Sequence, residues 1–302
     1  MEATEGNMAS TPRIGLALGS GAARGWSHIG VIRALEQAGI VPEVVCGTSI
    51  GALVGAAYAA GRLTELETWV RGLTWPAIAK DLFDWHLIGG LIQGAKLVDF
   101  FRARFDDPGI EHLPKKFACV ATELTTGREV WLQEGSVVDA VRASIAMPGL
   151  LTPIVRGDRL LVDGGLVNPV PVSLCRALGA EIVIAVDLNW DLIGRRAKVP
   201  ELPPTVGAPM QSGLIDAVFG RFRERTISAS ALPSVLDVLT TSLNIMQVRI
   251  TQSRLAGEPA DVLVRPRLSG IAAMDFHRAA VAAAEGERAG KQAAQMVNDL
   301  LA

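Results

Sequence analysis

A serine stands in the middle of a short motif suited to nucleophilic chemistry. Residues 47–51 read Gly-Thr-Ser-Ile-Gly, a G-x-S-x-G pattern between an expected strand and an expected helix. A serine on such a sharp turn exposes its hydroxyl at the edge of a sheet, and the glycines permit a crowding that side chains would block. Without a strand and a helix beside it, the pattern would predict only a tight turn. We therefore expect Ser49 to be a nucleophile, with the Ile50 amide helping to hold an oxyanion.

A second glycine-rich loop, residues 19–25 (GSGAARG), also lies between an expected strand and an expected helix. Successive backbone N–H groups at a helix N-terminus form a site for negative charge. A dinucleotide fingerprint needs glycine where Arg24 stands, and a phosphate-binding P-loop needs a lysine that the loop lacks. An oxyanion-binding loop is the remaining interpretation. Arg24 would either bind a substrate phosphate or anchor the loop.

A serine nucleophile needs a group that accepts its proton, and the sequence offers two kinds. The chain has four histidines, His28, His86, His112 and His277. Only His277 follows in the Ser-Asp-His order of α/β-hydrolases, and it falls in an expected helix. Asp163 ends an expected strand before two glycines, a pattern that alone predicts a turn. A carboxylate in a partly desolvated site can accept the serine proton directly, so both a histidine triad and a Ser49–Asp163 pair stay open.

The elements that must position these motifs begin with two strand-loop-helix units. Residues 14–18 and 44–46 are short apolar runs, each followed by a loop and a helical pattern. The first helix is expected to stop at Gly39. Short connections of this kind favour a parallel sheet covered by helices. The predicted fold class is therefore α/β.

The rest of the chain extends this pattern within a single predicted domain, residues 13–302, after a disordered lead-in at 1–12. Strands are expected at 116–123, 128–133, 159–162, 182–186 and 262–264, the first two as a hairpin. Helices are expected at 137–144, 172–178, 235–255 and 276–301, with Ser144 as a packing residue at a helix end. Residues 191–233 contain five prolines and no sustained period, which predicts a loop or mobile cover.

Composition excludes several classes of protein. The chain has 302 residues, of which 49% are hydrophobic but only 5% aromatic, and a net charge of -2. Near-neutral charge gives no basic field for nucleic acid. Three scattered cysteines predict neither a disulfide framework nor a Cys-rich metal site, and indicate a cytoplasmic protein. The uncharged stretch 44–61 approaches the length of a membrane span, but its β-branched start and the break at 47–49 favour a buried strand-turn-helix.

Together the motifs resemble those of the patatin-like phospholipases, specifically their short bacterial branch. The resemblance rests on residues 15–40, on the 47–51 motif, and on Asp163-Gly164-Gly165 followed by Asn-Pro-Val-Pro at 168–171, and it covers residues 15–187. It implies a three-layer α/β fold and a Ser49–Asp163 dyad without a histidine, and it requires no metal or organic cofactor. It also implies an oxyanion hole from the amides of Gly19, Ser20, Gly21 and Ala22. Ser20 departs from the glycine of many members, which leaves the detailed geometry of the loop open.

The expected function is a serine lipid acyl hydrolase that cleaves carboxylic esters of lipids or phospholipids through an acyl-enzyme. The expected partner is a lipid or fatty-acyl ester, with peripheral membrane contact and no nucleic acid. The aromatic-rich residues 69–105 are candidates for an acyl-pocket wall or an interfacial surface, or for ordinary helix packing. Two alternatives remain: a lipid transacylase with the same dyad, and a noncatalytic regulatory or scaffold protein on the same fold.

Overall fold

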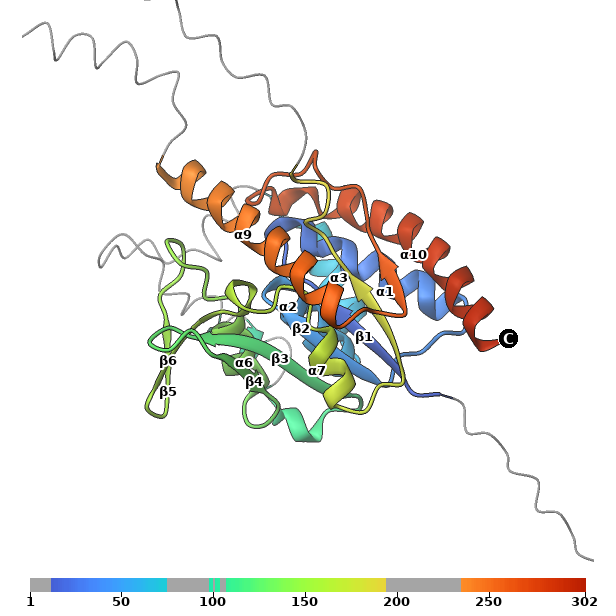
Figure 1. The fold of residues 1–302 in the computed structure, drawn as a ribbon, viewed down its shortest axis with the longest axis horizontal. Helices are drawn as coiled ribbons and strands as arrows, with labels where there is room; N and C mark the ends of the chain where they lie inside the picture. The colour runs from blue at the N-terminus through green and yellow to red at the C-terminus, as the bar shows by residue number, and fades with distance from the viewer. Residues whose placement is uncertain (1–11, 75–97, 100, 104–106, 194–234) are drawn as a thin grey trace, which may run out of the picture.

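The computed structural model describes residues 12–74, 98–99, 101–103, 107–193 and 235–302. Within these ranges the chain forms one eight-stranded sheet in the order β5-β6-β3-β2-β1-β7-β8, with β4 paired to β3 outside this path (Figure 1). The strands are β1 (Ile14–Leu18), β2 (Val44–Thr48), β3 (Lys116–Glu123), β4 (Glu129–Leu132), β5 (Ile154–Arg156), β6 (Arg159–Asp163), β7 (Ile182–Val186) and β8 (Val262–Val264).

The middle of the sheet is parallel. β1 pairs in parallel with β2 and β7, β2 with β3, and β7 with β8. The ladders of β4, β5 and β6 are antiparallel. β1 and β2 are buried along their whole length, as expected where helices cover both faces of a sheet. Parallel alignment places the C-terminal ends of β1, β2 and β7 at one edge, so the loops that follow them meet there.

Alternate residues of each strand enter different layers of the core. Leu16 and Leu18 of β1 belong to the larger hydrophobic cluster, whereas Ala17 faces the smaller one. The larger cluster includes α1 (Ser27–Gln37), α2 (Ile50–Ala59), α3 (Leu63–Arg71), α6 (Val137–Ser144) and α10 (Ala279–Leu301). The smaller cluster includes α7 (Val172–Ala177), and α9 (Val235–Gly257) packs against it through Leu255. The predicted three-layer α/β fold is confirmed.

The alanine-rich helix α10 lies alongside α1 (Figure 1). Glycine makes this close approach possible: a Cβ at Gly286 would stand 1.9 Å from the carbonyl oxygen of Ser27, and one at Gly290 would stand 2.9 Å from the Cα of Val31. Small residues at such a contact let the two backbones approach and gain dispersion energy. Much of the aliphatic and glycine-rich composition therefore serves close helix packing.

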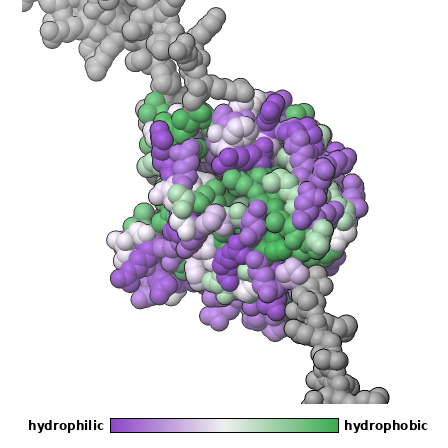
Figure 2. All heavy atoms as spheres, turned by 45° about the vertical axis from the view of Figure 1, so that its right-hand side comes forward, coloured by the Kyte–Doolittle hydropathy of each residue, from purple (hydrophilic) through white to green (hydrophobic). Residues whose placement is uncertain are grey.

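The uncharged stretch 44–61 forms β2 and α2, and every residue of α2 is buried. The predicted strand-turn-helix is thus confirmed. In the part of the chain that the structure describes, no helix combines the length and apolar character needed to cross a bilayer. Figure 2 shows apolar residues gathered in the middle of one face, with hydrophilic residues around them. Exposed large apolar side chains include Val238, Leu239, Ile245 and Met246 of α9 and Val281 and Met296 of α10.

Among the described residues, the predicted strands and helices appear near their expected bounds. Elements that the sequence did not predict include the helix α3 and the three-residue strand β5, which is too short to show a periodic pattern. The expected terminal helix begins as a 3₁₀ turn, η5 (Phe276–Arg278), before α10. The predicted lead-in at 1–12 and cover at 191–233 lie outside the described residues, apart from residue 12 and residues 191–193.

Candidate active site

Ser49 lies on a sharp turn between β2 and α2. Its φ of 57° and ψ of −125° are unusual for a residue with a side chain, and backbone strain of this kind gathers at functional sites. The flanking positions have room only for glycine. A Cβ at Gly47 would stand 2.4 Å from the Cα of Ala52, and one at Gly51 would stand 2.1 Å from the carbonyl oxygen of Leu18. The predicted reason for both glycines of the motif is confirmed.

The sheet register brings Asp163 to Ser49 across an intervening strand. Thr48 of β2 pairs with Val120 of β3, and the next residue of β3, Ala121, pairs with Asp163 at the end of β6. Ser49 and Asp163 therefore lie at one level on either side of β3. Ser49 Oγ donates a hydrogen bond of 2.6 Å to Asp163 Oδ2. The two residues singled out in the sequence, 114 positions apart, thus meet in space.

Burial makes Asp163 a better proton acceptor than an ordinary aspartate. The residue is 3% exposed, and this burial raises its pKa to about 6. Hydrogen bonds from Ser49 Oγ and from the Gly165 amide, which donates to Oδ1 at 2.7 Å, oppose the rise. Each carboxylate oxygen therefore has a donor that fixes its orientation. A base whose pKa lies near neutrality suits proton transfer from an alcohol.

Ser144 holds the backbone of the Ser49 turn. The Ser49 amide donates to Ser144 Oγ at 2.9 Å, and Ser144 Oγ in turn donates to the carbonyl oxygen of Val120 at 2.6 Å. Ser144 is fully buried at the end of α6. The expectation that it only packs therefore misses a supporting hydrogen bond. Its local sequence carries no signal for this role, because the role depends on α6 ending beside a turn that lies far away in the chain.

The loop after β1 binds to the rest of the sheet through its first two amides. The Gly19 amide donates to the carbonyl oxygen of Val186 at 3.1 Å, and the Ser20 amide donates to that of Pro169 at 2.9 Å. Each of these N–H groups already has a backbone acceptor. Of the four successive amides predicted to form an oxyanion hole, those of Gly19 and Ser20 therefore support the loop. The oxyanion hole itself stays a prediction.

Three other amides of the two motif loops have no acceptor in the described part of the chain. Among the described residues, no hydrogen-bond acceptor lies against the amides of Gly21, Ala22 or Ile50. Ala22 has a φ of 50°, the second strained backbone position in a residue with a side chain. Ala22 and Ile50 line the same cavity, so the two motif loops face each other. Two of the three amides without an acceptor therefore belong to residues at one cavity.

Two buried side chains anchor the loop. His28 Nε2 donates to the carbonyl oxygen of Gly19 at 2.8 Å, and burial lowers the pKa of His28 to about 4, although this bond opposes the shift. Arg24 is 3% exposed and donates from Nη2 to Asn189 Oδ1 at 3.2 Å and to Asn244 Oδ1 at 3.4 Å. Burial lowers its pKa to about 10, so it stays charged at neutral pH. These contacts favour the anchoring role for Arg24 over the predicted phosphate contact.

None of the described histidines bonds to Ser49. His28 supports the loop, and the side chain of His112 is 74% exposed beside Glu111. His277 lies exposed in η5, and His86 lies outside the described residues. The arrangement therefore favours the Ser–Asp alternative over a histidine triad.

An apolar cavity opens beside the Ser49 turn. Its lining includes Ala22 and Ile50 from the two motif loops, together with Trp26, Leu53, Trp69, Phe101, Ile145, Met147, Leu150, Leu151 and Phe276. Trp69 packs edge-to-face against Trp26 and Phe101, with ring centroids 6.2 and 5.9 Å apart. Two members of the predicted aromatic wall, Trp69 and Phe101, thus line this cavity, whereas residues 75–97 lie outside the described ranges.

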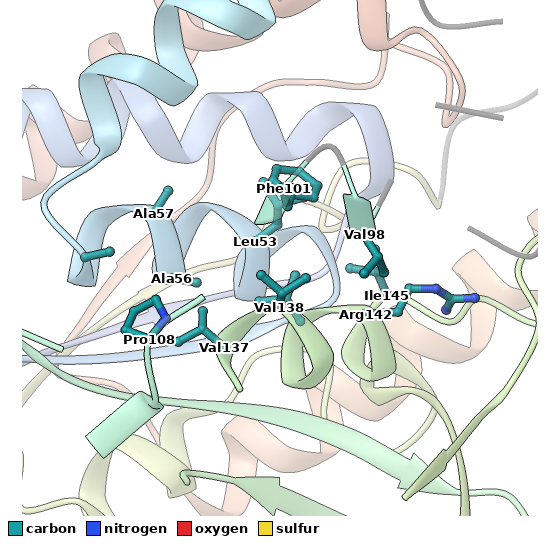
Figure 3. Close-up of a pocket in the computed structure, with 12 residues that line it drawn as sticks. Leu53, Ala56, Ala57, Val98, Phe101, Pro108, Val137, Val138, Arg142 and Ile145 are labelled. Carbon is teal, nitrogen blue, oxygen red and sulfur yellow. The ribbon is translucent and has the colours of Figure 1, made fainter. Parts of the chain in front are cut away.

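A second apolar cavity adjoins the first, between α2 and α6 (Figure 3). Leu53, Phe101 and Ile145 line both cavities. The walls of the second include Ala56 and Ala57 from α2 and Val137, Val138 and Val141 from α6. Adjoining apolar spaces next to a polar reaction centre suit a ligand with a hydrocarbon chain.

The chain is similar to known proteins in sequence and in fold. The family model of the patatin-like phospholipases matches residues 16–176. An uncharacterized NTE family protein of Mycobacterium bovis is 33% identical, with the match covering 94% of this chain and 92% of that protein. The lysophospholipase nte1 of Aspergillus fumigatus is 29% identical over 87% of this chain but only 17% of its own length. The solved structure of VipD from Legionella pneumophila has the same fold, with a TM-score of 0.58 at 14% identity over 95% of this chain and 67% of that chain. Since the family model covers more than half of the chain and a relative matches nearly all of it, the chain belongs to the patatin-like phospholipase family.

Proposed function

We propose that the protein is a serine lipid acyl hydrolase in which Ser49 attacks a carboxylic ester and Asp163 transfers the proton. Family membership supports lipid hydrolase activity in general. The observation that carries the finer assignment is the 2.6 Å hydrogen bond from Ser49 Oγ to Asp163 Oδ2 in a buried site. That bond points the hydroxyl proton at an acceptor whose pKa is raised toward neutrality.

Acylation begins when Ser49 Oγ forms a bond to the carbonyl carbon of the ester and its proton passes to Asp163 Oδ2. The carbonyl oxygen becomes the oxyanion of a tetrahedral intermediate. Collapse of this intermediate breaks the bond between the carbonyl carbon and the alcohol oxygen. The departing alcohol takes the proton from Asp163, which leaves an acyl ester on Ser49 and an ionised carboxylate.

Deacylation repeats these steps with water. Asp163 accepts a proton from water as the water oxygen bonds to the acyl carbon, and a second tetrahedral intermediate forms. Its collapse expels Ser49 Oγ, which recovers the proton, and releases a carboxylic acid. One water is consumed for each ester bond broken, and a single carboxylate serves both half-reactions.

The amides of Gly21, Ala22 and Ile50 are the donors that we assign to the oxyanion. Ile50 begins α2, so its N–H lies at the positive end of the helix dipole. Ala22 is held in a strained conformation before the substrate arrives. Donors that are already in position stabilise the charge that develops in the transition state, because the loop does not have to rearrange during the reaction.

The two apolar cavities are assigned to the acyl chain, with the chain end in the second cavity. Ala56→Leu is expected to fill part of that cavity. Hydrolysis of palmitoyl p-nitrophenyl ester should then fall about tenfold, because two displaced methylenes cost about 0.8 kcal/mol each. Butyrate ester, which is too short to reach Ala56, should keep its kcat/KM within about twofold. If Ala56→Leu lowered kcat/KM by the same factor for esters of all acyl-chain lengths, the assignment would be contradicted.

A fluorophosphonate probe tests the dyad, because such probes modify activated serines. Wild-type protein should be labelled, and peptide mass spectrometry should locate the adduct on Ser49. Heat-denatured protein is the control and should not react. Absence of labelling in a folded sample would instead support the noncatalytic alternative. Product analysis with an added alcohol acceptor distinguishes hydrolysis from transacylation.

The pH dependence of hydrolysis should report the ionisation of Asp163. The carboxylate must be deprotonated to accept the serine proton, and burial raises its pKa to about 6. We therefore expect kcat/KM to rise tenfold per pH unit below about pH 6 and to level off above it. Initial rates with an activated ester between about pH 4.5 and pH 8.5 provide the measurement. A flat profile between about pH 5 and pH 7 is the contrary result.

A further inference from the structure

Residues beyond the family match reach the loop that bears the oxyanion donors. The match ends at residue 176, whereas Asn189 follows β7 and Gln247 lies in α9. Ser20 Oγ donates to Gln247 Oε1 at 3.0 Å. Asn189 Nδ2 donates to Gln247 Oε1 at 3.1 Å, and to Ser20 Oγ and the carbonyl oxygen of Ser20 at 3.3 Å each. The three side chains form a closed hydrogen-bonded triangle.

The triangle is shielded from water at two of its corners. Ser20 and Asn189 are each 2% exposed, and Gln247 is partly buried above them. Arg24 extends the cluster by donating to Asn189 Oδ1 at 3.2 Å. Gly21 and Ala22 therefore lie in the chain between two anchored residues. Ser20, before them, bonds to Asn189 and Gln247, and Arg24, after them, bonds to Asn189. Hydrogen bonds removed from competing water restrain such a loop effectively.

Gln247 also touches the loop that carries Asp163. A Cβ at Gly165 would stand 2.5 Å from Gln247 Nε2, so the side-chain amide of Gln247 occupies the space left by the glycine. The Gly165 amide is the donor that fixes Asp163 Oδ1. One side chain of α9 thus spans the loop of the proposed oxyanion donors and the loop of the proposed base.

We propose that Gln247 is a positioning residue that clamps the oxyanion loop through the hydroxyl of Ser20. The inference rests on the proposed function, since Ser20 directly precedes Gly21 and Ala22, whose amides are assigned to the oxyanion. Ser20 is also the position at which the loop departs from the family pattern. In this chain its hydroxyl is the group that Gln247 Oε1 accepts from.

Hydrogen exchange tests the clamp without requiring any activity. Gln247→Met keeps the length of the side chain and removes the acceptor. Amides in a peptide covering residues 19–25 should exchange about tenfold faster, which corresponds to the loss of one hydrogen bond that restrains the loop. The matched control is Gln252→Met, an exposed glutamine of the same helix that accepts from Arg249, and it should leave the loop unchanged. Equal exchange in Gln247→Met and wild type would overturn the clamp.

A double-mutant cycle tests its effect on the reaction. Gln247→Met should lower kcat about tenfold and change KM less than about twofold, because misaligned oxyanion donors weaken the transition state more than bound substrate. Ser20→Ala should have a similar effect. The double variant should be no slower than the slower single variant, since both remove the same bond.

If the fold-losses in kcat of the two single variants multiplied in the double variant, Ser20 and Gln247 would act independently, and the proposal would be overturned. If the wild-type protein hydrolysed no ester, and Gln247→Met still made the loop amides exchange faster than in wild type, the proposed function would be rejected while the clamp would stand. Unchanged kcat in a Gln247→Met enzyme with faster loop exchange would reject the positioning role itself.

Discussion

Ser49→Ala should lower kcat for ester hydrolysis by roughly 10⁴-fold or more, because removal of a serine nucleophile eliminates the acyl-enzyme route. The substitution removes Oγ, the atom that donates to Asp163 at 2.6 Å. It leaves the Ser49 amide, which donates to Ser144, in place. Initial rates with a lysophospholipid and with an activated ester measure the effect, and the thermal midpoint checks that the variant folds.

Ser253→Ala is a matched control for this experiment. Ser253 is exposed on α9, and its replacement should leave kcat within about twofold of wild type, as is usual for surface positions. If Ser49→Ala retained more than about a tenth of the wild-type kcat, the nucleophile assignment would fail, since the residual route without a nucleophile is far slower.

Asp163→Asn should lower kcat by roughly 10³- to 10⁴-fold, comparable to other losses of a group that orients or deprotonates a nucleophile. Asparagine has the shape of aspartate, and its amide oxygen can still accept from Gly165. It has no basic oxygen for the Ser49 proton at neutral pH. KM should change little, because the bond to Ser49 belongs to the enzyme rather than to bound substrate. Fluorophosphonate labelling should slow in parallel, and a labelling rate equal to wild type would contradict the role as base.

The same substitution should stabilise the fold at neutral pH. The pKa of Asp163 is raised from 3.8 to about 6 in the folded protein by burial, so folding favours the protonated carboxyl. The protonated Asp163 carboxyl contributes fully to stability below about pH 4, and this contribution is lost as the pH rises through about 6. The free energy of unfolding changes by about 3 kcal/mol across this range. Asparagine carries no charge and escapes this loss. The free energy of unfolding in urea should therefore exceed that of wild type at about pH 8 and match it near pH 4. An equal difference at both pH values would contradict this account.

The Ser49 turn and the glycine-rich loop are predictable because their causes are local. Gly47 and Gly51 flank Ser49 within five residues, and the strand and helix patterns on either side place the turn at a sheet edge. Where backbone crowding excludes a Cβ, the sequence must have glycine, so such a position can be recognised from the sequence. The parallel strands can be predicted in the same way, because burial on both faces of a sheet requires continuous runs of apolar residues.

The partner of Ser49 depends on register, which no local pattern contains. Asp163 reaches Ser49 because β6 pairs with β3 at Ala121, one residue beyond the pairing of Thr48 with Val120. From the residues alone, a histidine triad and a Ser49–Asp163 pair both stayed open, with Asp163 favoured by its combination with Ser49. The family resemblance then implied the pair without a histidine. Side-chain alternation makes the choice sensitive, since a shift of one residue in a strand turns every side chain to the other face.

The supports of the site belong wholly to the tertiary structure. Ser144 and Gln247 are ordinary residues of two helices, and they matter because α6 ends beside the Ser49 turn and α9 contacts the loop that contains Ser20. The amides of Gly19 and Ser20 likewise donate to carbonyl groups more than a hundred residues away in the chain. The sequence by itself therefore determined the serine on its sharp turn, the glycine-rich loops and the fold class, because these follow from backbone freedom and hydrophobic pattern. Only the tertiary structure decided which side chain accepts a hydrogen bond from Ser49 and which loop amides have a backbone acceptor, because hydrogen bonds between distant segments exist only once the sheet has assembled.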